Sequence, residues 1–337
     1  MLDKLALGHF PTPLFHSTKL DALVGTTVWV KRDDMTGGAE SGNKIRKLEY
    51  LLAAALREGA DTVMTCGAAQ SNHARATALL GARLGLKALL FLRTPQPENP
   101  PPPTGNLLLD RMVGAEVRFI TPAEYAGRAE VMEAARRELA NRGRRAYVIP
   151  EGGSNGLGAF GYIDALREVR DQLDSGAADS SAPFDAVVHA CGSGGTAAGV
   201  ALGASLSRAA HRVIAIAVCD DRRYFERVVA RIVREAKELD PRLLDPAPLV
   251  IEDRFKGPAY GVATDEQLAF IVDVARACGL VLDPVYSGKA LFGLARLDPK
   301  PKRALFIHTG GLPGLLAHPE PIVSALDRSI ARSGETP

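Results

Sequence analysis

The sequence predicts an α/β fold with two lobes. Short runs rich in β-branched residues alternate with longer segments of helical apolar periodicity, which is typical of βαβ units around a parallel sheet. The 337 residues exceed what one compact core usually reaches before a chain divides. The 33 glycines and 22 prolines indicate many tight turns, because the hydrophobic fraction of 46% is that of an ordinary globular protein.

Strands are expected where β-branched and aliphatic residues concentrate: Thr27–Lys31, Thr62–Thr65, Lys87–Leu92, Glu116–Ile120, Ala146–Ile149, Ala186–Ala190, Val213–Val218 and Ala304–His308. Apolar periodicity predicts helices over Lys44–Arg57, Asn72–Leu84, Ala129–Asn141, Gly158–Leu173, Thr196–Ser207, Arg222–Leu239 and Asp265–Cys278. Thr94–Gly105, which is rich in proline, and Asp174–Pro183, which is rich in small residues, read as surface loops. The composition of the second loop makes it a candidate boundary between lobes.

The charge balance and the cysteines narrow the class of function. A formal net charge of +2 does not indicate binding of nucleic acid or anionic lipid, so we expect a small-molecule substrate. Paired spacing of the kind found in zinc sites or redox dithiols is absent, and buried reduced thiols are expected at Cys66, Cys191, Cys219 and Cys278. Without a signal peptide or a run of apolar residues long enough to span a bilayer, we expect a cytoplasmic protein with no membrane partner.

Lys44 is a candidate nucleophile because of where it falls in the predicted helix. A glycine-containing turn, Ser41–Asn43, leads into this helix, and side chains of a first turn point back past the helix N-terminus. The positive end of the helix dipole, with Arg46 and Lys47 nearby, should lower the pKa of the Lys44 amine. A solvated surface lysine is the alternative for any single lysine taken alone.

A second polar cluster, Gln70–His73, lies between a strand end and a helix start, where open α/β sheets bind ligands. The backbone N–H groups and the side chains of Ser71 and Asn72 suit a carboxylate or a cofactor oxygen. In isolation, Ser71 or Asn72 is equally well explained as an N-cap. A further glycine-rich stretch, Gly152–Gly161, is adequately explained as a helix entry capped by Ser154 or Asn155.

The segment Cys191–Gly199 follows an apolar strand and opens a helix of small residues, which suits a phosphate-binding loop. Glycines allow backbone amides to approach an anion, and Ser193 and Thr196 add hydroxyl donors. The spacing Gly192-x-Gly194-x-x-Ala197 also fits the degenerate dinucleotide fingerprint, with Asp220 as the ribose-binding acid. This motif alone leaves the choice open.

Three C-terminal segments place hydroxyl groups beside glycine turns: Gly257–Gly261, Leu282–Lys289 and Ile307–Pro313. The first two contribute Tyr260, Tyr286 and Ser287. For each tyrosine alone, core packing with one satisfied hydroxyl is the more frequent role.

Together these motifs resemble the fold-type II pyridoxal-phosphate enzymes, specifically the D-cysteine desulfhydrase and 1-aminocyclopropane-1-carboxylate deaminase family. The resemblance runs from Phe10–Leu14 to His308–Gly311. It implies a tryptophan synthase β-like fold of two domains, each with a mainly parallel twisted sheet flanked by helices. Residues 1–54 and 152–337 would form a large domain that binds pyridoxal 5′-phosphate, and residues 55–151 a small mobile domain. It also implies a homodimer.

The resemblance assigns a role to each motif. Lys44 would bond to the cofactor and move the proton at the substrate Cα, and Tyr260 and Tyr286 would act as acids or positioning groups. Ser71 would bind the substrate carboxylate with Asn72 and His73, and is a candidate for relaying protons. Asn72 would also donate a hydrogen bond to the ring hydroxyl oxygen of the cofactor, and Thr309 and Gly310 would make further contacts with the substrate. The cofactor phosphate would be bound by Gly192, Ser193, Gly194, Gly195 and Thr196.

Ser287 separates the activities of the family, because the deaminases resemble one another in having glutamate there, near the pyridine nitrogen. A neutral hydroxyl makes the ring a weaker electron sink, which suits elimination of a good leaving group from Cβ. We therefore predict conversion of D-cysteine to pyruvate, hydrogen sulfide and ammonia. The alternatives are an L-cysteate sulfo-lyase and a 1-aminocyclopropane-1-carboxylate deaminase. Departures from the family pattern at Ser41, Ala76 and Leu312–Pro313 lie near the predicted pocket and bear on the substrate.

Two alternative functions of other classes are a nicotinamide-dependent oxidoreductase and a non-catalytic binding protein that kept the fold. The first would use the Gly192 loop and Asp220, but it leaves Lys44 and Ser71 without a common purpose. The second does not require a lysine, hydroxyl groups and a phosphate loop together. No metal site is expected.

Overall fold

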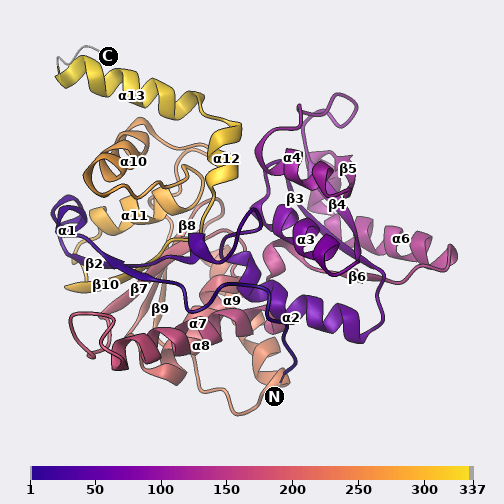
Figure 1. The fold of residues 1–337 in the computed structure, drawn as a ribbon, viewed down its shortest axis with the longest axis horizontal. Coiled ribbons are helices and arrows are strands. Elements are labelled where there is room, and N and C mark those ends of the chain that lie inside the picture. Colours follow the sequence, from indigo (N-terminus) through magenta and orange to yellow (C-terminus); the bar gives the residue numbers. More distant parts are fainter. Residues whose placement is uncertain (1, 334–337) are drawn as a thin grey trace.

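The computed structural model describes residues 2–333 and contains two lobes, each built on its own sheet (Figure 1). The larger lobe has a six-stranded sheet in the order β1-β2-β10-β7-β8-β9, and the smaller has a four-stranded sheet in the order β5-β4-β3-β6. Every pairing in the two sheets is parallel except that between β1 and β2. The predicted α/β fold with parallel-dominated sheets is confirmed.

The strands of the large sheet are β1 (Leu14–His16), β2 (Thr27–Lys31), β7 (Ala186–Cys191), β8 (Val213–Ala217), β9 (Leu249–Glu252) and β10 (Arg303–Ile307). The small sheet contains β3 (Thr62–Ala68), β4 (Lys87–Arg93), β5 (Glu116–Ile120) and β6 (Ala146–Val148). The central strands β3, β4, β7, β8 and β10 are almost continuously buried, as expected for parallel strands covered on both faces.

The helices that cover the large sheet are α1 (Thr18–Val24), α7 (Gly156–Asp174), α8 (Gly195–Ser207), α9 (Arg222–Leu239), α10 (Asp265–Cys278) and α11 (Ser287–Arg296). The small sheet is covered by α3 (Asn72–Arg83) and α4 (Gly105–Met112) on one face and by α5 (Pro122–Ala126) and α6 (Arg128–Asn141) on the other. Helix α2 (Lys44–Arg57) packs against α7 and α3 and so joins the lobes. The C-terminal part forms α12 (Leu312–Ala317) and α13 (Glu320–Ser333).

The predicted elements agree with the structure to within two residues at each end, except that β3 continues three residues beyond Thr65 to Ala68. The strands β1 and β9 were not predicted, because they are short edge strands with few buried residues. Several helices were also not predicted, of which α4, α5 and α12 are too short to show helical periodicity. The loop Asp174–Pro183 does not divide the lobes, because it joins α7 to β7 within the large lobe.

A buried ion network fixes the first turn of α2 to the large lobe. The Arg46 guanidinium donates to Asp33 Oδ1 at 2.8 Å and to Glu168 Oε2 at 2.9 Å, and Tyr162 Oη donates to Asp33 Oδ2 at 2.7 Å. Burial alone would raise the pKa of Asp33, but the charges of Arg46 and Lys31 and the hydrogen bonds from Arg46 and Tyr162 together outweigh it, and the pKa lies below its usual value. This network therefore holds a charged aspartate and the N-terminus of α2 in one position.

Close contact between helices also fixes α2. Helix α7 crosses α2 at Gly161, where an added Cβ would lie 2.3 Å from the backbone oxygen of Arg46. Glycine is therefore needed here for close approach and not for a special backbone angle. Within residues 2–333, no helix has both the length and the hydropathy needed to cross a bilayer.

Candidate active site

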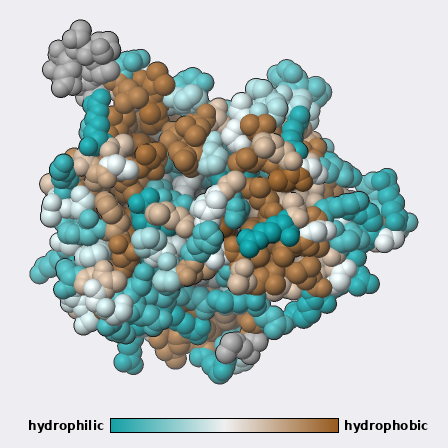
Figure 2. Space-filling model, viewed as in Figure 1, coloured by the Kyte–Doolittle hydropathy of each residue, from teal (hydrophilic) through white to brown (hydrophobic). Residues whose placement is uncertain are grey.

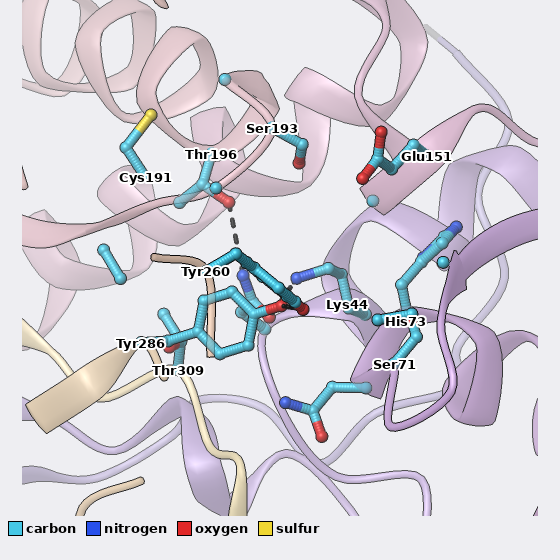
Figure 3. Close-up of a pocket in the computed structure, with 18 of the residues that line it drawn as sticks. Lys44, Ser71, His73, Glu151, Cys191, Ser193, Thr196, Tyr260, Tyr286 and Thr309 are labelled. Atoms are coloured by element: carbon cyan, nitrogen blue, oxygen red, sulfur yellow. Dashed lines mark hydrogen bonds between the residues drawn. The ribbon is translucent and has the colours of Figure 1, made fainter. Parts of the chain in front are cut away.

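The pocket that carries the candidate chemistry lies where the N-termini of α2, α3 and α8 meet between the lobes (Figure 3). Figure 3 shows Lys44 pointing into the hollow between the tyrosine pair on one side and Ser71 and His73 on the other. The predicted site residues that line this pocket are Lys44, Ser71, Asn72, His73, Gly192, Ser193, Gly194, Thr196, Tyr260, Tyr286 and Thr309. Residues separated by more than 200 positions in the sequence are thus brought together.

Lys44 is the first residue of α2, as predicted, and its Nζ donates to Asn43 Oδ1 at 2.9 Å. Burial and, to a smaller extent, the positive charge of Arg75 lower the pKa of Lys44 to about 8, against a partial opposing effect of Asp283 and Glu151. The predicted direction of the shift is confirmed. A pKa near 8 leaves a useful fraction of neutral, nucleophilic amine at physiological pH.

The expected contribution of Arg46 to this shift is wrong. Its guanidinium points away from Lys44 and is neutralised by Asp33 and Glu168. Lys47 does lie close to Lys44, since the pKa of Lys47 is lowered first by burial and then by the charge of Lys44. The buried Lys47 amine donates to the backbone oxygen of Gly152 at 3.1 Å. Arg75, on α3 of the other lobe, supplies the charge that the sequence analysis assigned to Arg46.

Ser71 is the N-cap of α3, with its Oγ accepting from the backbone N–H of Ala74 at 3.1 Å. Because its hydroxyl still has a proton to donate, the capping role leaves the side chain able to bind a carboxylate. The Asn72 Oδ1 accepts from Asn106 Nδ2 at 3.0 Å, which orients the Asn72 amide at the pocket wall.

His73 is engaged away from the centre of the pocket. Its Nε2 lies 2.9 Å from Thr65 Oγ1 on strand β3. Burial lowers the pKa of His73 well below its usual value, and the charges of Lys44 and Lys47 lower it further. The ring is therefore neutral at physiological pH, and contact with an anion would come from its single N–H group rather than from a positive charge.

The glycine loop between β7 and α8 has the form of an anion cup. Gly194 has a φ of +80°, and α8 begins at Gly195, so the N–H groups of its first turn have no intrahelical acceptors. The Ser154 Oγ accepts from the Gly195 N–H at 3.2 Å and lies 2.8 Å from Ser193 Oγ. An added Cβ at Gly195 would lie 2.6 Å from that Ser154 hydroxyl, so any larger residue would displace the loop.

Tyr260 and Tyr286 form a pair, with their hydroxyl oxygens 2.5 Å apart and their rings edge to face. Burial raises the pKa of Tyr260 to about 12, although its hydrogen bond to Tyr286 lowers it in part. Burial also raises the pKa of Tyr286 well above its usual value. Both hydroxyls are therefore protonated at physiological pH, and together they can hold or donate one proton at the pocket.

Ser287 does not line the pocket in this structure. Its hydroxyl is fully buried, donates to Asp283 Oδ1 at 2.6 Å and accepts from the Asp283 N–H at 3.0 Å. Gly195 and Gly310 also lie outside the pocket lining, while Thr309, next to Gly310, is part of it. The Asp283 carboxylate additionally accepts the N–H groups of Val285 and Tyr286, which fixes the turn that presents Tyr286.

Several residues that shape the site were not predicted as site residues: Asn43, Arg75, Glu151, Ser154 and Asp283. Arg75 was detectable in principle, because it lies one helical turn after Ser71 and therefore on the same side of α3. Its Nη2 donates to the backbone oxygen of Ser41 at 2.5 Å, which links α3 to the turn before Lys44. Gly152, which sequence reasoning assigned to a plain helix entry, also lines the pocket; Asn155 is the N-cap of α7, as expected.

The dinucleotide reading does not fit this arrangement. Asp220, its ribose-binding acid, lines a neighbouring cavity and not the pocket that contains Lys44. Of the four cysteines, Cys191 lines the pocket, and burial raises the pKa of its thiol to about 12, which keeps it protonated at physiological pH. The described structure shows no disulfide among them; Cys66 and Cys191 are buried as expected, whereas Cys219 and Cys278 are partly exposed.

The residues present fit pyridoxal phosphate. A lysine with a lowered pKa faces a glycine-lined helix N-terminus across one pocket, which matches an aldehyde at one end of a ligand and a phosphate at the other. The close approach of Ser154 leaves no room for a side chain at position 195 of this loop.

Comparisons with known proteins agree with this assignment. Residues 5–310 match the model of the family described as pyridoxal-phosphate dependent enzyme. The chain is 44% identical over 321 residues to the bifunctional D-cysteine desulfhydrase/1-aminocyclopropane-1-carboxylate deaminase, mitochondrial, of Arabidopsis thaliana, covering 92% of this chain and 78% of that protein. It is 39% identical over 330 residues to the D-cysteine desulfhydrase of Serratia proteamaculans, covering 94% and 96% of the two chains.

A solved structure of a 1-aminocyclopropane-1-carboxylate deaminase homologue matches with a TM-score of 0.85 and 37% identity, covering 96% of both chains. The chain therefore belongs to the pyridoxal-phosphate dependent enzymes of fold type II, among the lyases named D-cysteine desulfhydrase and 1-aminocyclopropane-1-carboxylate deaminase, and pyridoxal phosphate is its cofactor.

Proposed function

We propose that the enzyme eliminates the thiol group from D-cysteine and produces hydrogen sulfide, pyruvate and ammonia. The observation that carries the proposal is that one pocket contains both the Lys44 amine and the protonated Tyr260–Tyr286 pair. One group can take a proton from the substrate Cα while the other supplies a proton to a leaving group at Cβ. The Serratia relative named D-cysteine desulfhydrase supports the choice of substrate.

The cofactor would be held at three places. Lys44 would bond to its aldehyde carbon, Asn72 would donate a hydrogen bond to its ring hydroxyl oxygen, and its phosphate would accept hydrogen bonds from Gly192, Ser193, Gly194, Gly195 and Thr196. When bound, pyridoxal phosphate withdraws electrons from the substrate Cα and so makes loss of the Cα proton feasible.

The substrate carboxylate would bind at the N-terminus of α3. The Ser71 hydroxyl keeps its proton available while its oxygen caps the helix, and the Asn72 amide and the backbone N–H groups of this turn add donors. His73 would contribute without carrying a charge. Thr309 and Gly310 would limit the substrate on the opposite side.

Proton transfer would use Lys44 and the tyrosines. The Lys44 amine, whose pKa is near 8, accepts the Cα proton. The electron pair of the Cα–H bond then forms the Cα–Cβ double bond, the Cβ–S bond breaks, and the sulfur leaves with a proton from the tyrosine pair. The remaining three-carbon unit takes up water and yields pyruvate and ammonia, so that all atoms balance.

The role of Ser287 stays a prediction. Its hydroxyl is neutral, as the argument for a weak electron sink requires, but it is bonded to Asp283 behind the pocket wall. L-Cysteate and 1-aminocyclopropane-1-carboxylate are the alternative substrates, and the name of the Arabidopsis relative includes deamination of the second compound.

A substrate panel tests the proposal. The purified holoenzyme is incubated with D-cysteine, L-cysteine, L-cysteate, β-chloro-D-alanine, D-serine and 1-aminocyclopropane-1-carboxylate, and pyruvate, other keto acids, sulfide and sulfite are measured. We expect D-cysteine and β-chloro-D-alanine to be the best substrates. Keto acid formed mainly from the cyclopropane compound, or sulfite formed mainly from L-cysteate, would replace the proposed reaction by the corresponding alternative.

The domain boundaries follow as a second part of the proposal. Residues 1–54 and 152–337 would form the cofactor domain and residues 55–151 a small domain that closes over the substrate. Support comes from the sheet of the small lobe, whose strands lie within Thr62–Val148, and from helix α2, which spans the junction. Closure would bring the Ser71 turn toward Lys44.

We also propose a homodimer that uses the apolar surface beside the notch between the lobes (Figure 2). Exposed Leu108 and Met112 on α4 lie near exposed Leu312 and Leu316 on α12, because these helices pack together. Light scattering of the wild type and of the double variant Met112→Glu, Leu316→Glu tests this surface; a dimer that survives both changes would place the interface elsewhere.

The cytoplasmic location likewise stays a proposal, which microscopy of a tagged chain in its own cell would test.

A further inference from the structure

The mouth of the pocket opens into a second cavity of about 720 Å³ between the lobes. Residues that line both spaces include Ala68, Glu151, Gly192, Ser193 and Tyr260. A substrate on its way to Lys44 can therefore pass through this cavity. Its walls come from β4, α5 and α6 of the small lobe and from α9 and the loop before α10 of the large lobe.

Arg93, the last residue of β4, lies at this mouth between two aromatic rings. Its guanidinium carbon is 4.9 Å from the ring centre of Tyr125 and 5.7 Å from that of Tyr260. Tyr125 belongs to the small lobe, and Tyr260 belongs to the large lobe. Both distances are within the range of cation–π attraction.

The guanidinium of Arg93 has no competing ion pair in the structure as described for residues 2–333. The neighbouring Arg128 differs, because it pairs with Glu151 at 3.0 Å while lying 5.0 Å from the same Tyr125 ring. The positive charge of Arg93 is thus free to interact with the two rings, and it joins one lobe to the other at the edge of the pocket.

The backbone that carries Tyr260 is tied to the large lobe at its base. The buried Lys289 amine donates to the backbone oxygens of Lys256 at 2.6 Å and Ala259 at 3.0 Å. The same loop is exposed at Pro258, Ala259 and Gly261. The Tyr260 ring is partly buried by turning inward, where it meets Tyr286 and Arg93.

We infer that Arg93 is a positioning residue that links the small lobe to Tyr260, so that the tyrosine takes its working position when the lobes are together. This inference rests on the proposed role of Tyr260 in proton transfer. Lys289 fixes the start of the loop that carries Tyr260, and Arg93 fixes the position of the Tyr260 ring. A change in the separation of the lobes would therefore move the Tyr260 hydroxyl.

The test replaces Arg93 by methionine, which keeps the bulk and removes the charge, and by lysine, which keeps a cation. The matched control is Arg118→Met, because Arg118 makes the same kind of contact, 5.9 Å from the Phe91 ring, within the small lobe alone. We expect Arg93→Met to lower kcat for D-cysteine about two- to fivefold with a smaller change in KM, in line with the loss of a partly exposed cation–π contact. Arg93→Lys should restore part of that loss, and the control should have wild-type kinetics.

A second measurement does not depend on turnover. Hydrogen–deuterium exchange of the holoenzyme should be several times faster in residues 257–262 for Arg93→Met than for the wild type or the control. In a Tyr260→Leu background, Arg93→Met should have little further effect on this exchange, because the partner ring is already absent.

Three outcomes would overturn the inference: unchanged exchange in residues 257–262, kinetics of Arg93→Met equal to those of the control, or a loss confined to substrates with an anionic side chain. The last result would make Arg93 a direct binder of the substrate. If the wild-type enzyme turned over none of the amino acids in the panel, the proposed function would fail, while the exchange experiment would still decide the inference.

Discussion

The base and the mouth of the pocket are held in different ways. At the base, the turn that presents Lys44 is fixed by the buried Arg46–Asp33 ion pair and by a hydrogen bond of 3.1 Å from the Asn43 N–H to the Thr309 oxygen. At the mouth, the Arg93 stack is partly exposed and crosses between the lobes. The nucleophile is thus held by buried bonds, whereas Tyr260, one of the two proton donors, depends on a partly exposed contact between the lobes.

Removal of the amine at the base should have the largest effect. We expect Lys44→Ala to lower turnover of the best substrate by about 10³-fold or more, because both cofactor attachment and proton removal are lost. The visible absorption band of the bound cofactor should change, and borohydride should no longer fix the cofactor to the chain. Lys87→Ala, an exposed lysine of the small lobe, is the control. Near-normal turnover of Lys44→Ala would invalidate the assignment of the nucleophile.

Removal of one hydroxyl from the Tyr260–Tyr286 pair should have an effect on the rate that depends on the leaving group of the substrate. Tyr286→Phe should lower the rate with D-cysteine about 10²- to 10⁴-fold, the range for loss of general acid catalysis. The rate with β-chloro-D-alanine should fall far less, because chloride leaves without a proton. Parallel assays with the two substrates measure this difference. Equal losses for both would show that the tyrosine positions the substrate instead of protonating the leaving group.

The ion network under the base should contribute more to stability than the stack at the mouth. We expect Arg46→Met to lower the free energy of unfolding by about 3–5 kcal/mol, because it leaves the Asp33 carboxylate buried and unpaired. For Arg93→Met the loss should be about 1 kcal/mol or less, since a partly exposed cation–π contact is weak. Urea unfolding of the two variants checks the difference. Similar losses would remove the distinction between a rigid base and a mobile mouth.

The lowered pKa of Lys44 should be visible as a moderate pH effect on cofactor uptake by the cofactor-free protein. Below a pKa of about 8, the neutral amine becomes about tenfold scarcer per pH unit, so uptake should accelerate as pH rises and level off above about 8. Arg75→Met removes a charge that lowers this pKa, and the plateau should shift to higher pH. Stopped-flow absorbance follows the reaction. A profile that still rises toward 10.5, the ordinary value for lysine, would contradict the shift.

Much of the base could be predicted from the sequence, because it consists of local patterns. The apolar stripe and the preceding glycine turn placed the start of α2 at Lys44, and the strand–glycine–helix pattern located the loop before Thr196. Each pattern spans about ten residues, so periodicity and turn chemistry alone decide it.

Contacts between distant segments could not be predicted in the same way, because they depend on how the lobes and loops pack. Arg75 contacts Ser41 beside the Lys44 turn, Ser154 contacts Ser193 in the glycine loop, and Arg93 contacts Tyr260 at the mouth. The local sequence pattern does not show which distant segments will meet. Ser287 illustrates a related difficulty. It follows Tyr286 in sequence, but α11 begins at Ser287, and a turn of about 100° per helical residue directs its hydroxyl toward Asp283.

The crossing of α7 over α2 at Gly161 has a consequence for engineering of this enzyme. A methyl group there would collide with the backbone of Arg46, two residues beyond the nucleophile, so that α2 or α7 would have to shift. Gly161→Ala would thus change the position of the amine without altering any group that lines the pocket. The position of the reactive nitrogen in the pocket thus depends on how closely α7 approaches α2. Redesign of the substrate range should therefore begin at Gly161.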